Sequence, residues 1–109
     1  MAWLLRDGEV LASLEVAESR RARARGLLGR DGVDGALLLR PCRSVHTLGM
    51  RFPIDVAFCD DGLRVLRIVT MPRHRLSRLV WRSRVVIEAE AGAFARWGLQ
   101  PGDALEVKG

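Results

Sequence analysis

Three side chains that could carry chemistry lie close together in the sequence: Cys42, His46 and Thr47. A thiol and an imidazole can act as nucleophile and base, and the same two groups bind transition metals. Catalysis also needs an orienting group and an oxyanion site, and a metal site needs three or four ligands. His74 is the only further histidine. We therefore expect no bound metal and no cofactor, and we interpret His46 as a half-buried structural side chain.

Two carboxylates, Asp55 and Glu88, fall inside runs of residues that are typical of strands. Alternation along a strand places each of them beside apolar residues of its own strand, where an isolated charge is costly to bury. Arg23, near the inner face of an expected helix, is the natural partner. We predict that Arg23 is held by Asp55, by Glu88 or by backbone carbonyls. The two carboxylates then form either a structural ion pair or turn cap, or an anion or substrate site.

A basic segment, residues 72–84, interleaves cationic residues with apolar ones: Arg73, His74, Arg75, Arg78, Arg82 and Arg84. A nucleic-acid groove combines cations for the phosphates with aromatic rings for stacking. Trp81 is the only aromatic residue of this segment, and no RNA-binding signature is present. We interpret the segment as a solvated loop with one buried apolar face, and we do not expect nucleic acid as the partner. Weak nucleic-acid binding through residues 72–84 is an alternative.

The pattern along the chain predicts an α+β fold that is rich in strands. Asp7-Gly8 is a hairpin signal, because both residue types tolerate a positive φ, and Ser19 can cap a helix. Short strands with no βαβ rhythm favour a mostly antiparallel barrel or curled sheet with two short helices. The expected strands are residues 2–6, 9–16, 36–39, 54–59, 63–71, 85–90 and 104–107, and the expected helices are residues 20–28 and 92–97.

Length and composition narrow the class of protein. The 109 residues, about half of them apolar, are enough for one core, so we expect a single domain over residues 1–109. The start of the sequence lacks a targeting segment and no apolar run could span a bilayer, which predicts a cytoplasmic location. Two cysteines are too few for a disulfide framework. The net charge of +5 comes from arginines spread along the chain, as a functional feature or through codon bias.

Three motifs together resemble a known family, the Domain of Unknown Function 192 family. Residues 19–30 (SRRARARGLLGR) are similar to its Thr-x-x-x-Arg-x-x-Gly-Leu-Met-x-Arg opening, and residues 53–58 (PIDVAF) to its Pro-Leu-Asp-x-x-Phe core. Residues 87–92 (IEAEAG), followed by Gly98 and Gly102-Asp103, resemble its closing motifs. The resemblance implies a small β-rich domain, often exported or lipid-anchored, and it implies no agreed activity, cofactor or catalytic residue.

This sequence departs from the family pattern in one segment. Residues 45–50 (VHTLGM) stand where many members have Phe-Trp-Met-Lys-Asn-Thr, so His46 occupies an aromatic position. The absence of an expected signal peptide is a second departure, and it argues against an exported role.

These observations favour a small non-enzymatic binding or accessory domain for a small molecule or a protein, with no membrane span. We expect its pocket to be bounded by residues 42–50, Arg23 and Asp55. The alternative is a small hydrolase-like or transferase-like enzyme that uses His46 with Asp55 or Cys42. The candidate ligand-binding residues are Arg23, His46, Thr47, Asp55 and Glu88.

Overall fold

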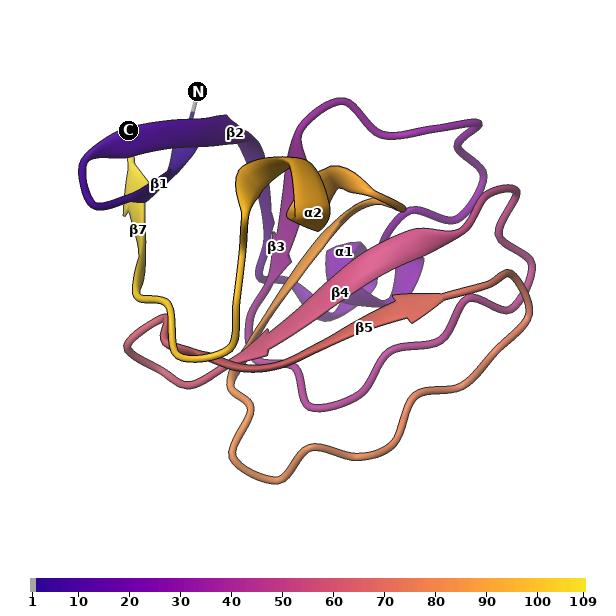
Figure 1. Ribbon diagram of the computed structural model, residues 1–109. Helices are drawn as coiled ribbons and strands as arrows, with labels where there is room; N and C mark the ends of the chain where they lie inside the picture. The colour runs from indigo at the N-terminus through magenta and orange to yellow at the C-terminus, as the bar shows by residue number, and fades with distance from the viewer. Residues whose placement is uncertain (1) are drawn as a thin grey trace.

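The computed structural model describes residues 2–109, in which seven strands form one curled sheet with two short helices (Figure 1). The sheet order is β5-β4-β6-β3-β2-β1-β7. The strands are β1 (Ala2–Arg6), β2 (Glu9–Ala17), β3 (Ala36–Leu39), β4 (Ile54–Cys59), β5 (Val65–Met71), β6 (Val85–Glu90) and β7 (Leu105–Lys108). The helices are α1 (Arg20–Arg25) and α2 (Ala93–Trp97). The expected α+β, strand-rich fold is confirmed.

The curl of the sheet brings its two ends towards each other. An isolated bridge joins Arg64, just before β5, to Ala104, just before β7. The backbone of Val65 also donates to the carbonyl of Asp103 at 2.9 Å. The rest of β5 pairs with β4 alone, so most of that strand is a free edge of the sheet.

One strand pair is parallel in a sheet that is, as expected, mostly antiparallel. β2 and β3 are parallel, with α1 in the connection between them, so the chain does contain one βαβ unit. The sequence pattern placed a helix between these two strands but did not reveal their parallel pairing; the helix itself has only six residues, none of them buried. All the other strand pairs are antiparallel.

Local signals explain where α1 begins and ends. The hydroxyl of Ser19 accepts a hydrogen bond from the backbone N–H of Ala22 at 3.0 Å, which caps the first turn. Gly26 takes a φ of +48°, a conformation that few residues other than glycine adopt, and its N–H donates to the carbonyl of Ala22. The helix therefore ends three residues earlier than Leu28, where the sequence pattern placed its end.

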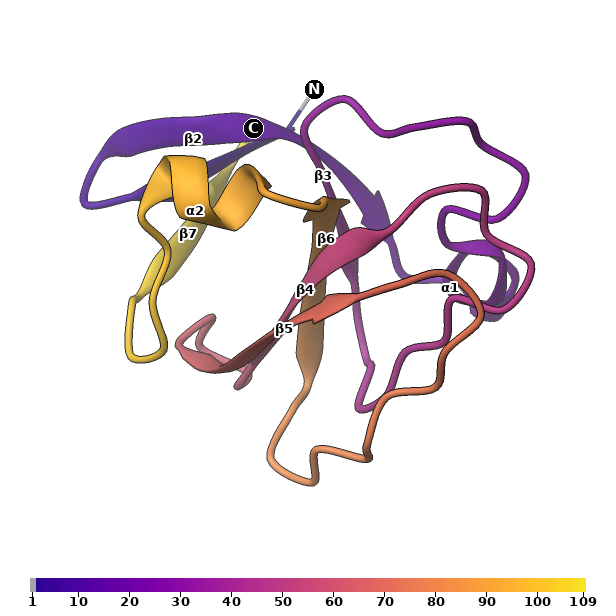
Figure 2. The same ribbon diagram turned by 45° about the vertical axis from the view of Figure 1, so that its right-hand side comes forward.

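Apolar side chains cover both faces of the sheet and form two clusters. One lies on the α2 side of the sheet and includes Leu4, Ala57, Ile87 and Phe94. The other lies on the opposite face, under α1 and the loops 40–53 and 72–84. Figure 2 shows α2 and α1 at opposite ends of the curled sheet. Both faces are therefore occupied, which explains why β3, β4 and nearly all of β6 are buried.

Candidate functional site

Glu88 lies in the middle of the sheet, on the face covered by α1. Its register partners are Leu37 of β3 and Val56 of β4, and both belong to the apolar cluster on that face. The residue is 4 % exposed, and its carboxyl group accepts no hydrogen bond from any of residues 2–109. Burial raises the pKa of Glu88 to about 7. The side chain is thus a buried carboxyl group without a protein partner.

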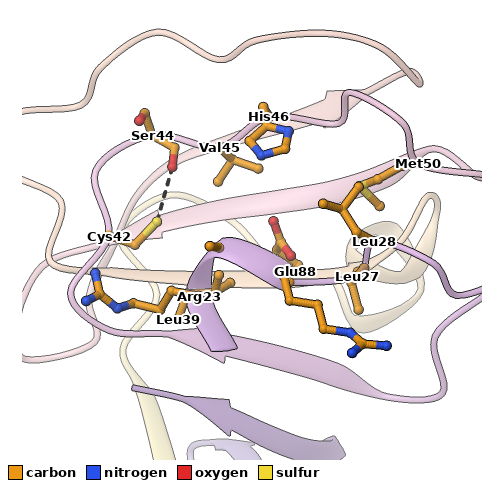
Figure 3. Close-up of a pocket in the computed structure, with 13 residues that line it drawn as sticks. Arg23, Leu27, Leu28, Leu39, Cys42, Ser44, Val45, His46, Met50 and Glu88 are labelled. Carbon is orange, nitrogen blue, oxygen red and sulfur yellow. Dashed lines mark hydrogen bonds between the residues drawn. The ribbon is translucent and has the colours of Figure 1, made fainter. Parts of the chain in front are cut away.

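A small pocket opens in front of this carboxyl group, between α1 and the segment 42–50 (Figure 3). Its volume of about 60 Å³ exceeds the space that a few water molecules need. Gly26 lies beside the carboxyl group, since a Cβ there would stand 3.7 Å from Oε1 of Glu88. The remaining lining is mostly apolar and includes Leu27, Leu28, Leu39, Val45 and Met50.

Arg23 lines the same pocket without pairing with either carboxylate. Its Nη1 donates to the carbonyl oxygen of Pro41 at 3.0 Å, so backbone, the third of the three predicted partners, holds it. In Figure 3 its guanidinium group points away from Glu88 and lies below Cys42. Its Nε is buried and has no hydrogen-bond partner among residues 2–109. The pocket wall therefore contains two unpartnered polar groups, the Glu88 carboxyl and the Arg23 Nε.

Cys42 and His46 also line the pocket, but they do not form a nucleophile and base. The thiol of Cys42 donates to the carbonyl of Ser44 at 3.2 Å, and burial raises its pKa. An activated cysteine has a lowered pKa instead. The ring of His46, whose side chain is exposed, makes no hydrogen bond with Cys42, Asp55 or Glu88 within the described part of the chain. Within residues 2–109, the two side chains therefore do not form the nucleophile and base of the enzymatic alternative.

Asp55 lies on the opposite face of the sheet from Glu88. Its Oδ1 accepts from the hydroxyl of Thr70 at 2.7 Å, and its Oδ2 accepts from the N–H groups of Gly92 and Phe94 at 2.9 and 3.1 Å. The carboxylate thereby caps the start of α2, because Gly92, the N-cap residue just before the helix, has no side chain to do so. Asp55 does not line the pocket, so the pocket is bounded by residues 42–50 and Arg23 but not by Asp55.

Thr47 is fully buried and joins the segments 42–50 and 72–84. Its hydroxyl donates to the carbonyl of Pro72 at 2.6 Å and accepts from the N–H of Arg75 at 2.9 Å. It is absent from the pocket lining, in contrast to its neighbour His46. The structure therefore brings Arg23, His46 and Glu88 together and places Thr47 and Asp55 elsewhere.

Replacing Thr47 with valine should weaken the attachment of the segment 72–84, which backbone hydrogen bonds still hold in part. Valine keeps the shape but removes both hydrogen bonds and leaves the part-buried N–H of Arg75 without this acceptor, at a cost of about 1–3 kcal/mol. Denaturant unfolding measures this loss. Ser44→Ala is the control, because that exposed hydroxyl makes no hydrogen bond within residues 2–109, and it should change stability by less than about 0.5 kcal/mol. Equal losses in both variants would contradict this role of Thr47.

Metal-binding groups do not gather in the described part of the chain. Among residues 2–109, no three His, Cys, Asp or Glu side chains stand close enough to hold a metal ion. His74 lies across the loop and uses its Nδ1 to accept from the N–H of Gly49 at 3.2 Å. Within the same residues, no helix has the length and apolar character needed to cross a membrane.

Sequence reasoning found Glu88 but missed most of what surrounds it. Leu27 and Leu28 fall in the range 20–28 that was expected to be helical, whereas they follow α1 in a turn and line the pocket. Gly26 is the one local signal of this turn, because a glycine late in an expected helix indicates that the helix ends there.

Comparisons with known proteins find relatives of the same fold and no established activity. No curated protein matches this chain. A crystal structure of a protein of unknown function from Novosphingobium aromaticivorans is 20 % identical, with a TM-score of 0.80 over 96 % of this chain and 82 % of that one. A protein from Sinorhizobium meliloti, proposed to be a transcription regulator, is 23 % identical, with a TM-score of 0.78 over 97 % of this chain and 91 % of that one. These identities show a shared fold alone.

The family is identified by the whole length of the chain. The family model DUF192, described as "Uncharacterized ACR", matches residues 2–107. That range includes both helices and nearly all of the sheet. The chain therefore belongs to the Domain of Unknown Function 192 family.

Proposed function

We propose that this chain is a small binding domain, and that its pocket between α1 and residues 42–50 accepts a small group with N–H donors, foremost an ammonium group. The observation that carries this proposal is the carboxyl group of Glu88, which is buried, lines the pocket and has no partner among residues 2–109. A buried carboxylate without a hydrogen-bond partner is costly. A ligand that donates to it would recover part of that cost.

The surroundings of Glu88 favour a cationic donor on a short apolar stem. Leu27, Val45 and Met50 line the pocket beside the carboxyl group and offer an apolar contact for such a stem. The guanidinium of Arg23 is turned towards Pro41 and away from Glu88, so it does not neutralise the carboxylate. The small volume limits the buried part of the ligand to a few atoms. The rest of a larger ligand would extend past His46, whose exposed side chain also lines the pocket.

An NMR titration with methylammonium tests this proposal, with acetate as a probe of similar size and opposite charge. Two heavy atoms limit the binding free energy to about −3 kcal/mol, so the expected Kd is roughly 10 mM or weaker. Shifts should concentrate at Gly26, His46 and Glu88, and affinity should increase as the pH rises through 7 because Glu88 loses its proton. Acetate should produce no shifts at these residues.

Two matched variants test whether Glu88 is the group that binds methylammonium. Glu88→Gln should abolish the methylammonium shifts, whereas Glu90→Gln, an exposed glutamate two residues further along, should leave them unchanged. Saturable binding of acetate in place of methylammonium, or methylammonium binding that survives Glu88→Gln, would overturn the proposal. The cytoplasmic location expected from the sequence stays a prediction.

A further inference from the structure

The longest stretch of this chain without an acidic residue is strongly basic. Residues 62–87 contain seven arginines and no aspartate or glutamate: Arg64, Arg67, Arg73, Arg75, Arg78, Arg82 and Arg84. The remaining 83 residues hold eleven basic and thirteen acidic residues, so they carry a formal charge of −2 against +5 for the whole chain. A second, shorter stretch without acids, residues 19–30, carries five arginines, so residues 62–87 are distinguished by the length of the acid-free run and not by its absence elsewhere. Codon bias can explain why the basic residues are arginines. It does not explain why acidic residues are missing from this stretch.

Most of residues 62–87 belong to β5, at one edge of the sheet, and to the loop 72–84 that follows it. The loop 72–84 pairs with residues 42–50 and not with β5: the N–H of Thr47 donates to the carbonyl of Arg75, and the N–H of Ser77 to that of Val45, both at 2.8 Å. Figure 1 shows the loop, in orange, running below β5. The outer edge of β5 beyond Val65 is therefore left without a neighbouring strand.

A trough lies between β5 and this loop. It consists of two adjoining depressions of about 260 and 490 Å³, which share Arg67, Val80 and Arg78 in their lining. Its apolar surface includes Val69 and Met71 from β5 and Leu76, Leu79 and Trp81 from the loop. Leu76 and Trp81 are each 72 % exposed, which is unusual for side chains of this size. Arginines and exposed apolar residues, most of them from the loop, thus line a trough beside a free strand edge.

We propose that an extended acidic segment of a partner protein docks along this trough and pairs with β5 as an additional strand. A free edge offers unpaired backbone N–H and C=O groups, and a docked strand inserts alternate side chains into adjoining pockets. The apolar pockets would take the apolar side chains of such a segment. The arginines would pair with its carboxylates.

The lining favours an acidic peptide over single-stranded nucleic acid. Proteins that bind single strands present aromatic side chains on which successive bases stack. Trp81 is the only aromatic residue on the loop side of the trough, and the guanidinium carbon of Arg43 already lies 6.0 Å from the centre of its ring. The aliphatic side chains of Leu76, Leu79 and Val69 suit apolar side chains better than they suit phosphates.

A titration of the full chain with a synthetic peptide tests the proposal. The probe alternates glutamate with valine over the length of β5, and a peptide that alternates lysine with valine and a single-stranded oligonucleotide are the comparison probes. We expect the acidic peptide to bind, with slowed amide hydrogen exchange at residues 66–70. The lysine peptide should not bind. Tighter binding of the oligonucleotide than of the acidic peptide, or peptide binding without protection of β5, would overturn the proposal.

Variants with equal charge changes separate the trough from general electrostatics. Arg67→Glu with Arg78→Glu should weaken peptide binding by at least about tenfold. Arg20→Glu with Arg21→Glu makes the same change in net charge on exposed positions of α1 and should have little effect. Leu76→Ser with Leu79→Ser, at exposed positions where folding is not at risk, should weaken binding several-fold. Equal losses in the two double charge variants, or no loss in the leucine variant, would contradict the assigned site.

Discussion

Replacing Asp55 with alanine is expected to lower the free energy of unfolding by about 3–6 kcal/mol. The substitution removes two hydrogen bonds from the N–H groups of Gly92 and Phe94 to a charged acceptor, each worth about 1.5–3 kcal/mol, and a third from Thr70. It also leaves a buried donor at the start of α2 without a partner, because Gly92 provides no side chain in its place. Such a loss is a large part of the stability of a small domain.

Denaturant unfolding of two further variants identifies the cause of this loss. Asp55→Asn keeps an acceptor oxygen and should fall between the wild type and the alanine variant. Asp34→Ala removes an exposed carboxylate that makes no hydrogen bond among residues 2–109, so its effect should stay below about 0.5 kcal/mol. A loss below about 1 kcal/mol in Asp55→Ala would show that the carboxylate does not hold α2.

The second large effect is a fall in stability with rising pH that depends on Glu88. The folded chain raises the pKa of this carboxyl group from 4.5 to about 7 through burial, so between these two values the folded state binds a proton that the unfolded state has lost. The unfolding free energy therefore decreases as the pH rises from about 4.5 to about 7. This difference between the two pKa values corresponds to a stabilisation of about 3 kcal/mol. The stabilisation is fully present below pH 4.5 and is lost above pH 7.

The contribution of Glu88 is isolated by comparing pH profiles of unfolding. Glutamine does not ionise, so Glu88→Gln should remove this part of the pH dependence, and its stability relative to the wild type should increase from acid to neutral pH. Glu106→Gln, on the exposed face of β7, should run parallel to the wild type. Parallel profiles for Glu88→Gln and the wild type would contradict the assigned burial of the carboxyl group.

The strands and turns could be predicted well because their signals are local. The bounds of β1, β3, β4 and β6 agree with the sequence pattern, since apolar runs of strand length are closed there by turn residues such as Asp7-Gly8. The parallel pairing of β2 with β3 left no such signal, because it depends on how residues 18–35 cross the sheet. Non-local pairing is decided by packing of the whole domain and not by the segment itself.

The candidate site could be predicted only in part, for a related reason. Alternation fixes which residues of one strand share a face, but it does not relate the faces of two strands. The register Val56 with Glu88 places Asp55 and Glu88 on opposite faces, and a shift by one residue would have put them on the same face. Arg23 and His46 could be recognised by residue type, whereas the turn after Gly26 that closes the pocket follows from tertiary packing.

The excess of positive charge in residues 62–87 can be read from the sequence, but only when acidic residues are counted together with the arginines. The run without acids between Asp61 and Glu88 is the longest in the chain, and it carries seven arginines. The structure adds what composition lacks, namely that these arginines stand beside a free strand edge and exposed apolar side chains.

The most direct test of the binding pocket is the pKa of Glu88 itself, measured by carbon NMR of its side-chain carboxyl group. In the free chain we predict a pKa of about 7, because burial disfavours the charged form. Saturation with methylammonium should lower this pKa, since a bound cation stabilises the carboxylate. An ordinary pKa near 4.5 in the free chain, or a raised pKa that methylammonium leaves unchanged, would contradict the assignment of this pocket as the binding site.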